Sequence, residues 1–366
     1  MIGALTRIFD NLLGRGEAAV TVPPLDGAFR PNRLLDEAPT RIALDQADDL
    51  AVVAGEIVVS AGDTIHTLAA DGTLKVRRAF TAPVTAIAAM GDGGVAAALA
   101  TGDIVVDGGA LDGRAYKAGE GLRCITALAI ADGYLCVANG SATNGAADWQ
   151  RDLLERNASG SIWRIDLAGG ASTRLAAGLA WPAGLAVDAD GVVFAEAWKH
   201  QLARIDAARP GKPKVLQHDL PGYPGRISPA ADGYWLALFA PRSQLVEFVL
   251  REPGYRKRML AEVAQPYWVS PKLRAGRSFY ESLQGGGVKH LGMLKPWAPA
   301  MSAGLVARLD RAFHPRASLQ SRADGRTHGV TSIVEFGDRI FAAAKGDGVV
   351  VALPLATVAG GKERRT

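Results

Sequence analysis

Residues 178–206 read GLAWPAGLAVDADGVVFAEAWKHQLARID, and this stretch decides the fold. It contains three short apolar runs, at 184–187, 192–197 and 201–205. The first two are joined by Asp-Ala-Asp-Gly, and this combination of Asp and Gly is typical of a tight hairpin turn. The loop before the third run is too short for anything except another reversal. Three antiparallel strands so close together make up most of a four-stranded propeller blade.

The same pattern of strand, Asp/Gly turn and strand recurs along the chain at intervals of about 40 residues. The six predicted strand pairs are 41–44 with 56–60, 85–89 with 94–99, 126–130 with 134–138, 184–187 with 192–197, 226–228 with 234–239, and 331–335 with 339–344. Six units predict an all-β fold, a six-bladed β-propeller that forms a single domain over residues 17–355. Closed all-β folds commonly reach this length as one domain.

Two intervals are longer than the rest, and each predicts an insertion. Residues 141–157, in the third blade, carry a helical patch at 147–156. Residues 261–300, in the fifth blade, are rich in aromatic residues and glycine. They predict either a lid over a central site or an inert excursion that covers a strand edge. The last blade is one strand short, and residues 18–22 are predicted to supply that strand and close the ring.

The two ends of the chain lie outside the predicted propeller. Residues 1–16 have apolar side chains at helical spacing, which predicts a short amphipathic helix docked on the body of the protein or on a membrane surface. Residues 356–366 are predicted to be a basic flexible tail. The net charge is only +4, and no nucleic-acid-binding motif accompanies the basic residues. We therefore expect a protein that does not bind nucleic acid. Because no secretory signal or transmembrane segment is visible, we also expect it to be cytoplasmic. Its oligomeric state is left open.

Several stretches are similar to a known family. They are 178–186 (GLAWPAGLA), 195–205 (AEAWKHQLARI), 220–227 (LPGYPGRI), 231–238 (ADGYWLAL), 304–310 (GLVARLD) and 328–344 (HGVTSIVEFGDRIFAAA). Together they resemble strictosidine synthase-like proteins, a group related to the gluconolactonase and paraoxonase propellers. The resemblance implies a six-bladed propeller that acts on a small molecule at one mouth of its central tunnel.

In such a propeller the first strands begin at one mouth of the tunnel, and the loops between second and third strands return to it. The predicted strand starts are Arg41, Thr85, Thr126, Ala183, Arg226 and Thr331. The predicted mouth loops contribute Ser60, Asp63, Asn139, Asn144, residues 196–200, Arg242 and Lys345. The candidate ligand-binding residues are Arg41, Asn139, Trp198, Lys199, Tyr223, Arg226, Trp268 and Thr331. The cationic side chains of Arg41 and Arg226 are explained equally well by a small anionic ligand and by structural pairing with Asp36, Glu37 or Glu196.

The resemblance also bears on a metal. The lactonase relatives hold calcium at this mouth with Asn, Asp and Glu side chains, because a hard cation needs several oxygen ligands. In this chain Ala183 replaces the Asn of the fourth blade, and Arg226 stands where the next blade is expected to carry Asp or Asn. Asn139 is a ligand type that remains, but one Asn does not make a site. We therefore predict no cofactor, with calcium as an open alternative.

Glu196, His200 and His328 are the candidate catalytic residues. Glu196 and His200 flank one mouth loop, where they could act as general base and general acid, with Lys199 or Arg226 holding an oxyanion or carboxylate. His328 comes just before the last first strand, which would point it toward the tunnel. The structural alternatives are that Glu196 braces neighbouring blades and that His200 pairs with a backbone carbonyl.

These residues leave three hypotheses for the function. The first is a hydrolase of a lactone, ester or related bond that works without the calcium ligands. The second is a non-catalytic propeller that binds a small anion or a protein partner. The third is a condensing enzyme of the Pictet-Spengler type. Strictosidine synthase itself uses an acidic residue near the start of the last blade, and no carboxylate lies in residues 328–333, so the third hypothesis moves the acid to Glu196.

Overall fold

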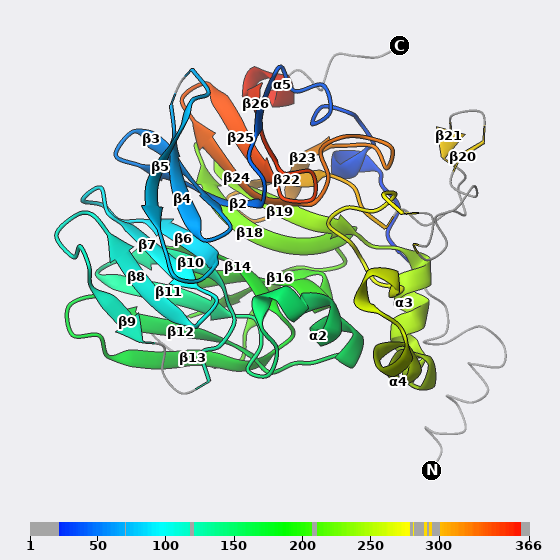
Figure 1. Cartoon of the computed structure of the whole chain (residues 1–366), viewed down its shortest axis with the longest axis horizontal. Coiled ribbons are helices and arrows are strands. Elements are labelled where there is room, and N and C mark those ends of the chain that lie inside the picture. The colour runs from blue at the N-terminus through cyan, green and yellow to red at the C-terminus, as the bar shows by residue number, and fades with distance from the viewer. Residues whose placement is uncertain are drawn as a thin grey trace.

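The computed structural model describes residues 22–69, 71–117, 121–206, 211–278, 281, 289–290, 293–294 and 301–359. Within these residues, six four-stranded antiparallel sheets surround a central axis (Figure 1). The predicted six-bladed β-propeller is confirmed. None of the helices in the described part of the chain is long and apolar enough to span a membrane.

Blades 1 to 4 each consist of four consecutive strands. Blade 1 contains β2 (Ala47–Val53), β3 (Glu56–Ala61), β4 (Thr64–Leu68) and β5 (Leu74–Ala79). Blade 2 contains β6 (Val84–Ala89), β7 (Val95–Leu99), β8 (Asp103–Asp107) and β9 (Ala115–Lys117). Blade 3 contains β10 (Ile125–Ala131), β11 (Tyr134–Asn139), β12 (Gly160–Asp166) and β13 (Ser172–Leu179). Blade 4 contains β14 (Pro182–Asp188), β15 (Gly191–Glu196), β16 (Gln201–Ile205) and β17 (Lys214–Gln217).

Blades 5 and 6 are assembled from segments that are distant in the sequence. Blade 5 contains β18 (Gly222–Ala230), β19 (Gly233–Pro241), β22 (Leu305–Asp310) and β23 (Pro315–Gln320). Blade 6 contains β24 (Val330–Phe336), β25 (Arg339–Ala344), β26 (Val349–Pro354) and, as its outermost strand, β1 (Thr40–Ala43). Because β1 pairs with β26 from Thr40 opposite Ala352 to Ala43 opposite Val349, the two ends of the propeller are joined in one sheet.

Two predictions at this junction are wrong. Residues 41–44 are not the first strand of blade 1, and residues 18–22 are not the closing strand, because β1 occupies the free edge of β26. The reason is a local turn. Ala54 and Gly55 have positive φ angles of 49° and 80° and join β2 directly to β3, so the strand that pairs with β3 is the one immediately before this turn. Residues 18–21 and the predicted helix at 1–16 lie outside the described residues.

The hydrophobic core is divided into layers between neighbouring blades. Strands β7 and β15 are buried at every residue, since both of their faces are covered by adjacent blades. Trp235 of blade 5, for example, packs with Ile333 of blade 6, and Phe341 of blade 6 packs with Val59 of blade 1. The inner strands β2, β6, β10, β14, β18 and β24 each contact the next one around the axis, so the ring is closed.

Both insertions join a second strand to a third strand, so they lie on the mouth side of the propeller. The connection in blade 3 holds η2 (Ala146–Asp148) and α2 (Trp149–Glu155), within the predicted helical patch. The connection in blade 5 holds α3 (Gln244–Arg251), α4 (Pro253–Glu262), η4 (Gln265–Tyr267), β20 (Lys289–His290) and β21 (Met293–Leu294). This insertion therefore begins directly after β19 and not at residue 261. Figure 1 shows α2, α3 and α4 grouped together, and α4 contacts both other helices.

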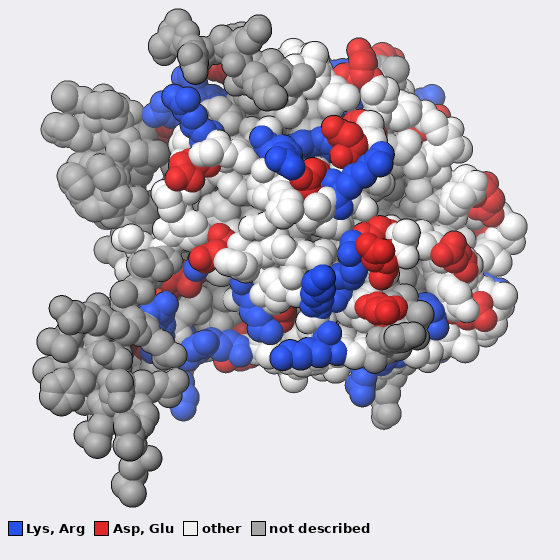
Figure 2. All heavy atoms as spheres, turned by 180° about the vertical axis from the view of Figure 1, so that it is seen from behind, with Lys and Arg blue, Asp and Glu red and all other residues white. Residues whose placement is uncertain are grey.

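Three shorter elements complete the described structure. They are η1 (Gly27–Phe29), η3 (Ala197–Lys199) and α5 (Ala356–Ala359). Because α5 is helical, the first residues of the predicted flexible tail are ordered on the propeller. The face seen in Figure 2 carries Lys and Arg interspersed with Asp and Glu, in agreement with the small net charge of +4.

Candidate functional site

Each inner strand has a register shift near its first residues, as expected of a β-bulge. The shifts lie between Ala47 and Leu50, Val84 and Ala86, Ile125 and Ala127, Pro182 and Gly184, Pro224 and Ile227, and Val330 and Ser332. A bulge leaves a residue unpaired and re-aims its side chain. The bulged positions are Asp48, Asp49, Thr85, Thr126, Ala183, Gly225, Arg226 and Thr331. Five of the six predicted strand starts are in this set, and the exception is Arg41.

Arg226 lies at the centre of the site and ties blade 5 to blades 1, 2 and 6. Its guanidinium donates hydrogen bonds to Oδ1 of Asp48 at 2.9 Å, to the carbonyl of Thr85 at 2.6 Å and to the carbonyl of Thr331 at 3.2 Å. Its Nε lies 3.0 Å from Oδ2 of Asp49, and its side chain is 14% exposed. Burial by itself lowers the pKa of an arginine, but the carboxylates of Asp48 and Asp49 outweigh that effect and raise the pKa of Arg226.

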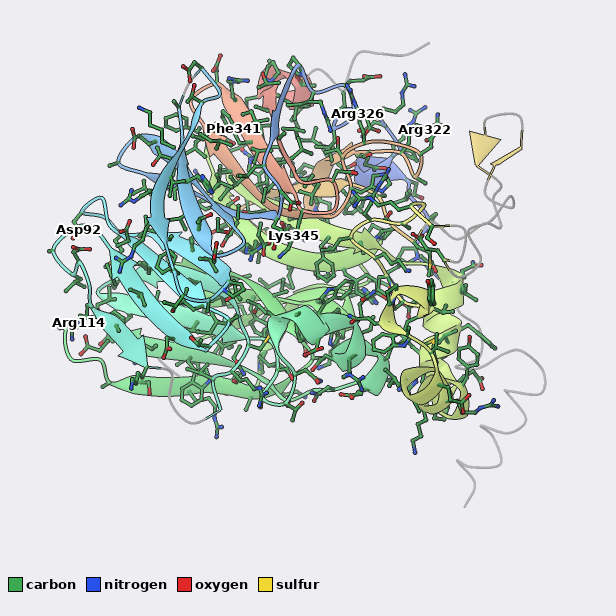
Figure 3. The ribbon with its side chains drawn as sticks, in the orientation of Figure 1. Asp92, Arg114, Arg322, Arg326, Phe341 and Lys345 are labelled. Carbon is green, nitrogen blue, oxygen red and sulfur yellow. The ribbon has the colours of Figure 1, made fainter. Side chains whose placement is uncertain are left out.

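Asp48 is shared between two cations. Besides Arg226, it accepts a hydrogen bond of 2.6 Å from Nζ of Lys345, the first residue after β25. Burial alone would raise the pKa of Asp48, yet the charges of Arg226 and Lys345 hold it far below its usual range. Lys345 is 37% exposed, and Figure 3 shows it near the centre of the ring of blades.

Asp49 is enclosed by hydrogen-bond donors. Its Oδ1 accepts from the hydroxyl of Ser332 at 2.8 Å, and its Oδ2 accepts from the N–H of Ile87 at 2.8 Å. Burial raises the pKa of Asp49 despite the nearby charge of Arg226. We refer to Asp48, Asp49, Arg226 and Lys345 as the central charged cluster. With two acidic and two basic side chains, this cluster has no net charge when all four are ionised.

This arrangement does not fit a calcium ion. Calcium takes roughly six to eight oxygen ligands, and the cluster places the guanidinium of Arg226 against the carboxylates that would supply them. Ala183 offers no side-chain oxygen, and the hydroxyl of Thr331 already donates to the carbonyl of Asp48 at 2.7 Å. In the part of the chain that the structure describes, no three His, Cys, Asp or Glu side chains gather in a way that could hold a metal.

Glu196, the predicted general base, is engaged in its own loop. Its Oε1 accepts a hydrogen bond from the N–H of Ala180 at 2.8 Å and forms an ion pair with Nζ of Lys199, also at 2.8 Å. Its Oε2 accepts a hydrogen bond from the side-chain amide of Gln201 at 2.6 Å. The side chain is 2% exposed. These contacts agree with the structural alternative for Glu196, because they brace the connection between blades 3 and 4. Lys199 is exposed beside it and is outside the central charged cluster.

His200 is also buried in structural contacts. Its Nδ1 lies 3.2 Å from the carbonyl of Gly222, and its Nε2 lies 3.1 Å from Oε1 of Glu247 on α3. Burial lowers the pKa of this imidazole, although Glu247 opposes the shift. The contact with Gly222 agrees with the alternative stated from the sequence, that His200 pairs with a backbone carbonyl. Helix α3, which was not predicted, supplies Glu247 as the partner of Nε2.

His328 is completely buried beneath the fifth-blade insertion. Its Nε2 donates to the carbonyl of Arg322 at 2.8 Å, so its Nδ1 is the acceptor for the hydroxyl of Ser302 at 2.8 Å and for Arg274 at 2.9 Å. Burial lowers the pKa of His328, and the positive charge of Arg274 adds to this effect. These contacts fix the insertion to blade 6 and leave no free ring nitrogen for a substrate.

Two predicted ligand-binding residues, Arg41 and Asn139, are engaged by protein groups. Arg41 lies on β1, the outermost strand of blade 6, where it donates to the hydroxyl of Thr327 at 2.8 Å. Asn139 is buried, accepts from the N–H groups of Arg123 and Cys124, and donates to two backbone carbonyls. All of its usual hydrogen-bonding capacity is therefore used. Neither side chain is available at the mouth.

Trp198 and Tyr223 belong to a group of rings on the mouth side of blades 3 to 5. Trp198 stacks between Trp181, at 5.2 Å between ring centroids, and Trp149 of α2, at 6.3 Å. Tyr223 and Phe239 meet Trp198 edge-on at 5.9 and 6.3 Å. We call these five residues the aromatic wall. Trp149, Trp181 and Phe239 were not predicted as site residues, and Trp149 is brought to this place by the third-blade insertion.

Trp268 has a different role from the one predicted. It is 3% exposed and packs with Met259, Val246 and other apolar side chains of the insertions. Its indole N–H donates to the carbonyl of Val263 at 2.8 Å. Trp268 is therefore a core residue of the fifth-blade insertion. The other aromatic residues proposed for a lid, at positions 279, 280 and 297, lie outside the described residues.

The central carboxylates are candidate site residues that were also not predicted from the sequence. Asp48 and Asp49 lie at the start of β2, which was displaced in the prediction by residues 41–44. A signal was present in the sequence. Every other predicted strand pair was joined by a short turn, whereas pairing 41–44 with 56–60 skipped the Ala-Gly turn at 54–55. Applying the same hairpin rule would have placed both aspartates at the mouth.

The comparisons with known proteins agree on the fold. No protein-family model and no curated protein sequence matches the chain. Among solved structures, it is similar to a gluconolactonase from Xanthomonas campestris (TM-score 0.52, 13% identity, 91% of this chain and 98% of that chain). It is also similar to regucalcin, a calcium-binding protein from Agrobacterium tumefaciens (TM-score 0.50, 17% identity, 91% and 95%). A provisionally assigned gluconolactonase matches at TM-score 0.50 and 10% identity, over 93% and 95% of the two chains. The chain therefore has a six-bladed propeller fold of the gluconolactonase and regucalcin type.

Proposed function

We propose that the protein is a hydrolase of a lactone or related ester, that its substrate binds at the tunnel mouth, and that it works without a metal. The observation that carries the proposal is the contact of 2.6 Å between Lys345 and Asp48, which places an accessible cation and an ionised carboxylate side by side. The central charged cluster has no net charge, so it favours a neutral substrate with a carbonyl group over an anion.

The reaction needs two contributions from this pair. The ammonium of Lys345 donates a hydrogen bond to the carbonyl oxygen and stabilises the negative charge that develops there. The carboxylate of Asp48 accepts a proton from water as the water oxygen bonds to the carbonyl carbon. The ring C–O bond then breaks, and its oxygen leaves with that proton to give a hydroxy acid. Arg226 does not touch the substrate in this scheme, and it holds Asp48 in position and in the charged form.

The sequence resemblance supports a finer assignment to the strictosidine synthase-like group. Within that group, a condensing reaction would need a proton-transferring acid near the amine. The residue assigned to this task, Glu196, is engaged by Ala180, Lys199 and Gln201 and lies outside the central charged cluster. The geometry therefore favours hydrolysis over condensation.

A non-catalytic binding role is the second candidate. It is favoured by the structural engagement of Glu196, His200 and His328, and by the low pKa of Asp48, which makes this carboxylate a weak base. Under this alternative the same mouth binds a neutral carbonyl compound and releases it unchanged.

Titration of acid release from a panel of lactones and aryl esters separates the two candidates. Lys345→Met is expected to lower kcat/KM by roughly a hundredfold or more, because it removes the donor to the developing charge. Lys75→Met is the matched control, since Lys75 is an exposed lysine on the outer strand of blade 1. Because the pKa of Asp48 is far below its usual range, the rate should not fall between pH 8 and pH 5. Absence of turnover across the panel, with ligand-induced stabilisation by the same compounds, would establish the binding role instead.

A further inference from the structure

The tunnel mouth has two chemically different halves. Five bulged positions, in blades 1, 2, 5 and 6, belong to the central charged cluster or hydrogen-bond with it. They are Asp48, Asp49, Thr85, Arg226 and Thr331. The positions in blades 3 and 4 are Thr126 and Ala183. Ala183 packs in the same hydrophobic cluster as the aromatic wall. A β-carbon placed on Gly140 would lie 2.8 Å from the methyl of Thr126 and 3.1 Å from the ring of Trp181. Blades 3 and 4 therefore carry apolar groups at the level where the other blades carry charged groups.

The two halves meet at Gly225. A β-carbon placed on this residue would lie 3.4 Å from Cδ1 of Phe239 and 3.9 Å from the carbonyl oxygen of Thr331. That carbonyl accepts a hydrogen bond from Arg226. One end of the aromatic wall, at Phe239, thus lies close to the backbone carbonyl of Thr331 that accepts from Arg226.

The outer part of the aromatic wall is accessible. Trp149 and Trp198 are partly exposed, and so is Leu273, which packs in the same cluster. The indole N–H of Trp198 is satisfied by Asp152 at 2.8 Å, so the polar end of this ring is occupied while apolar ring surface remains. The backbone of Leu273 lies close to the loop that carries Lys345, because a β-carbon on Gly346, the residue after Lys345, would lie 2.2 Å from the carbonyl oxygen of Leu273.

We infer that the aromatic wall is the subsite for an apolar group of the substrate. Resting on the proposed function, this inference defines the substrate class as lactones or esters that carry an alkyl chain or an aromatic ring next to the reacting carbonyl. The carbonyl lies at Lys345 and Asp48, and the apolar group extends over Phe239 toward Trp149 and Leu273. Polyhydroxylated substrates would bind less well, because their hydroxyl groups would lose water against the apolar rings.

The test uses ligands that bind without reacting. A series of δ-lactams with alkyl chains of increasing length is titrated by calorimetry into the full-length protein. Each methylene buried against the wall is worth at most about 0.8 kcal/mol, which is about fourfold in Kd, so we expect a two- to fourfold gain per methylene. The heat-capacity change on binding should become more negative along the series.

Variants of the wall locate the effect. Trp149→Ala and Leu273→Ala are expected to reduce the gain per methylene to less than 1.5-fold while leaving binding of the unsubstituted lactam within about twofold. Trp163→Ala is the matched control, since Trp163 is a partly exposed tryptophan on β12 that packs between blades 2 and 3, away from the aromatic wall. The wild-type slope should persist in this control. The Leu273 variant keeps the test decisive if the Trp149 variant does not fold.

The outcomes separate this inference from the proposed hydrolysis. The inference is overturned if affinity does not depend on chain length. It is also overturned if the gain in affinity per methylene is unchanged in both the Trp149 and the Leu273 variants. Neither outcome depends on whether lactones are hydrolysed. The predicted slope together with no turnover of the corresponding alkyl lactones supports the apolar subsite and overturns the hydrolase proposal. Turnover with no chain-length preference supports the hydrolase and overturns the subsite.

Discussion

Replacing Arg226 by methionine tests the central charged cluster most directly. The substitution keeps an unbranched apolar side chain but removes the cation that lies 2.9 Å from Asp48 and 3.0 Å from Asp49. Both carboxylates are buried, so each is left with less compensation for its charge. Removing one partner of a buried ion pair typically costs about 3–5 kcal/mol, because the remaining charge stays out of water. We expect a loss of this size in the free energy of unfolding at pH 7.5.

The loss should depend on pH in a defined direction. In the wild type the pKa of Asp48 is lowered by folding, so its contribution is present above the unfolded-state pKa of about 3.9 and is lost as the pH falls below it. In Arg226→Met, burial is opposed by fewer positive charges, so the pKa values of Asp48 and Asp49 rise. Both carboxyls then take up protons in the folded variant as the pH falls toward 4.5. The difference between wild type and variant should shrink by at least about 1 kcal/mol, since one pKa unit corresponds to about 1.4 kcal/mol.

Urea unfolding followed by circular dichroism at pH 7.5 and pH 4.5 measures both quantities. The matched control is Arg258→Met, because Arg258 also pairs with a carboxylate, Glu262, but is 79% exposed. An exposed pair of this kind is worth under about 1 kcal/mol. A loss at pH 7.5 no greater than that of the control, or a loss of the same size at both pH values, would refute the view that Arg226 neutralises buried carboxylates in the tunnel.

Four further predictions follow from specific contacts. Among the described residues, the buried hydroxyl of Tyr223 has no hydrogen-bond partner, so Tyr223→Phe should raise the free energy of unfolding, by about 1 kcal/mol, in the same urea assay. A β-carbon on Gly184 would lie 2.0 Å from the carbonyl oxygen of Gly225, so Gly184→Ala should destabilise by about 1–3 kcal/mol or more, and wild-type stability would contradict the close approach of β14 and β18. Deleting residues 1–21 should preserve a single cooperative transition in differential scanning calorimetry, whereas deletion through residue 46 removes β1 and should lose it. Millimolar calcium should leave the melting temperature unchanged; a site filled at a hundred times its Kd would add about 2.7 kcal/mol, and a clear rise would contradict the poor fit of the mouth to calcium.

The blades could be predicted because each hairpin is a local structure. The turn at 188–191 follows from residues that are neighbours in the chain, and the same holds for the turns before β7, β11, β19 and β25. Five of the six mouth positions could be named for the same reason, since each lies at the start of the strand before such a turn. The prediction was wrong in blade 1, where residues 41–44 were chosen as the first strand in place of β2, the strand next to the turn.

The candidate site was harder to predict than the fold, because its contacts are not local. The ion pair between Arg226 and Asp48 joins residues 178 positions apart. Sequence alone identified Arg226 and Lys345 as mouth residues but could not supply the carboxylate that they share. Glu196 and His200 were identified as chemically capable, and each of them turned out to be engaged by protein groups. For His200 the partner is Glu247 on α3, a helix inside an insertion whose beginning had been placed too late.

By itself, the sequence determined the fold class, the number of blades and the presence of two insertions. These features depend on residue type and on spacing within a few tens of residues. Only the tertiary structure decided which strand closes the ring, which side chains meet at the mouth and which titratable groups are already satisfied. Each of these depends on the positions of segments far apart in the chain: β1 takes the edge of β26, and Arg226 reaches residues of blades 1, 2 and 6. Local sequence patterns do not specify such contacts, because a strand can pair with any exposed strand edge that lies next to it in the folded ring.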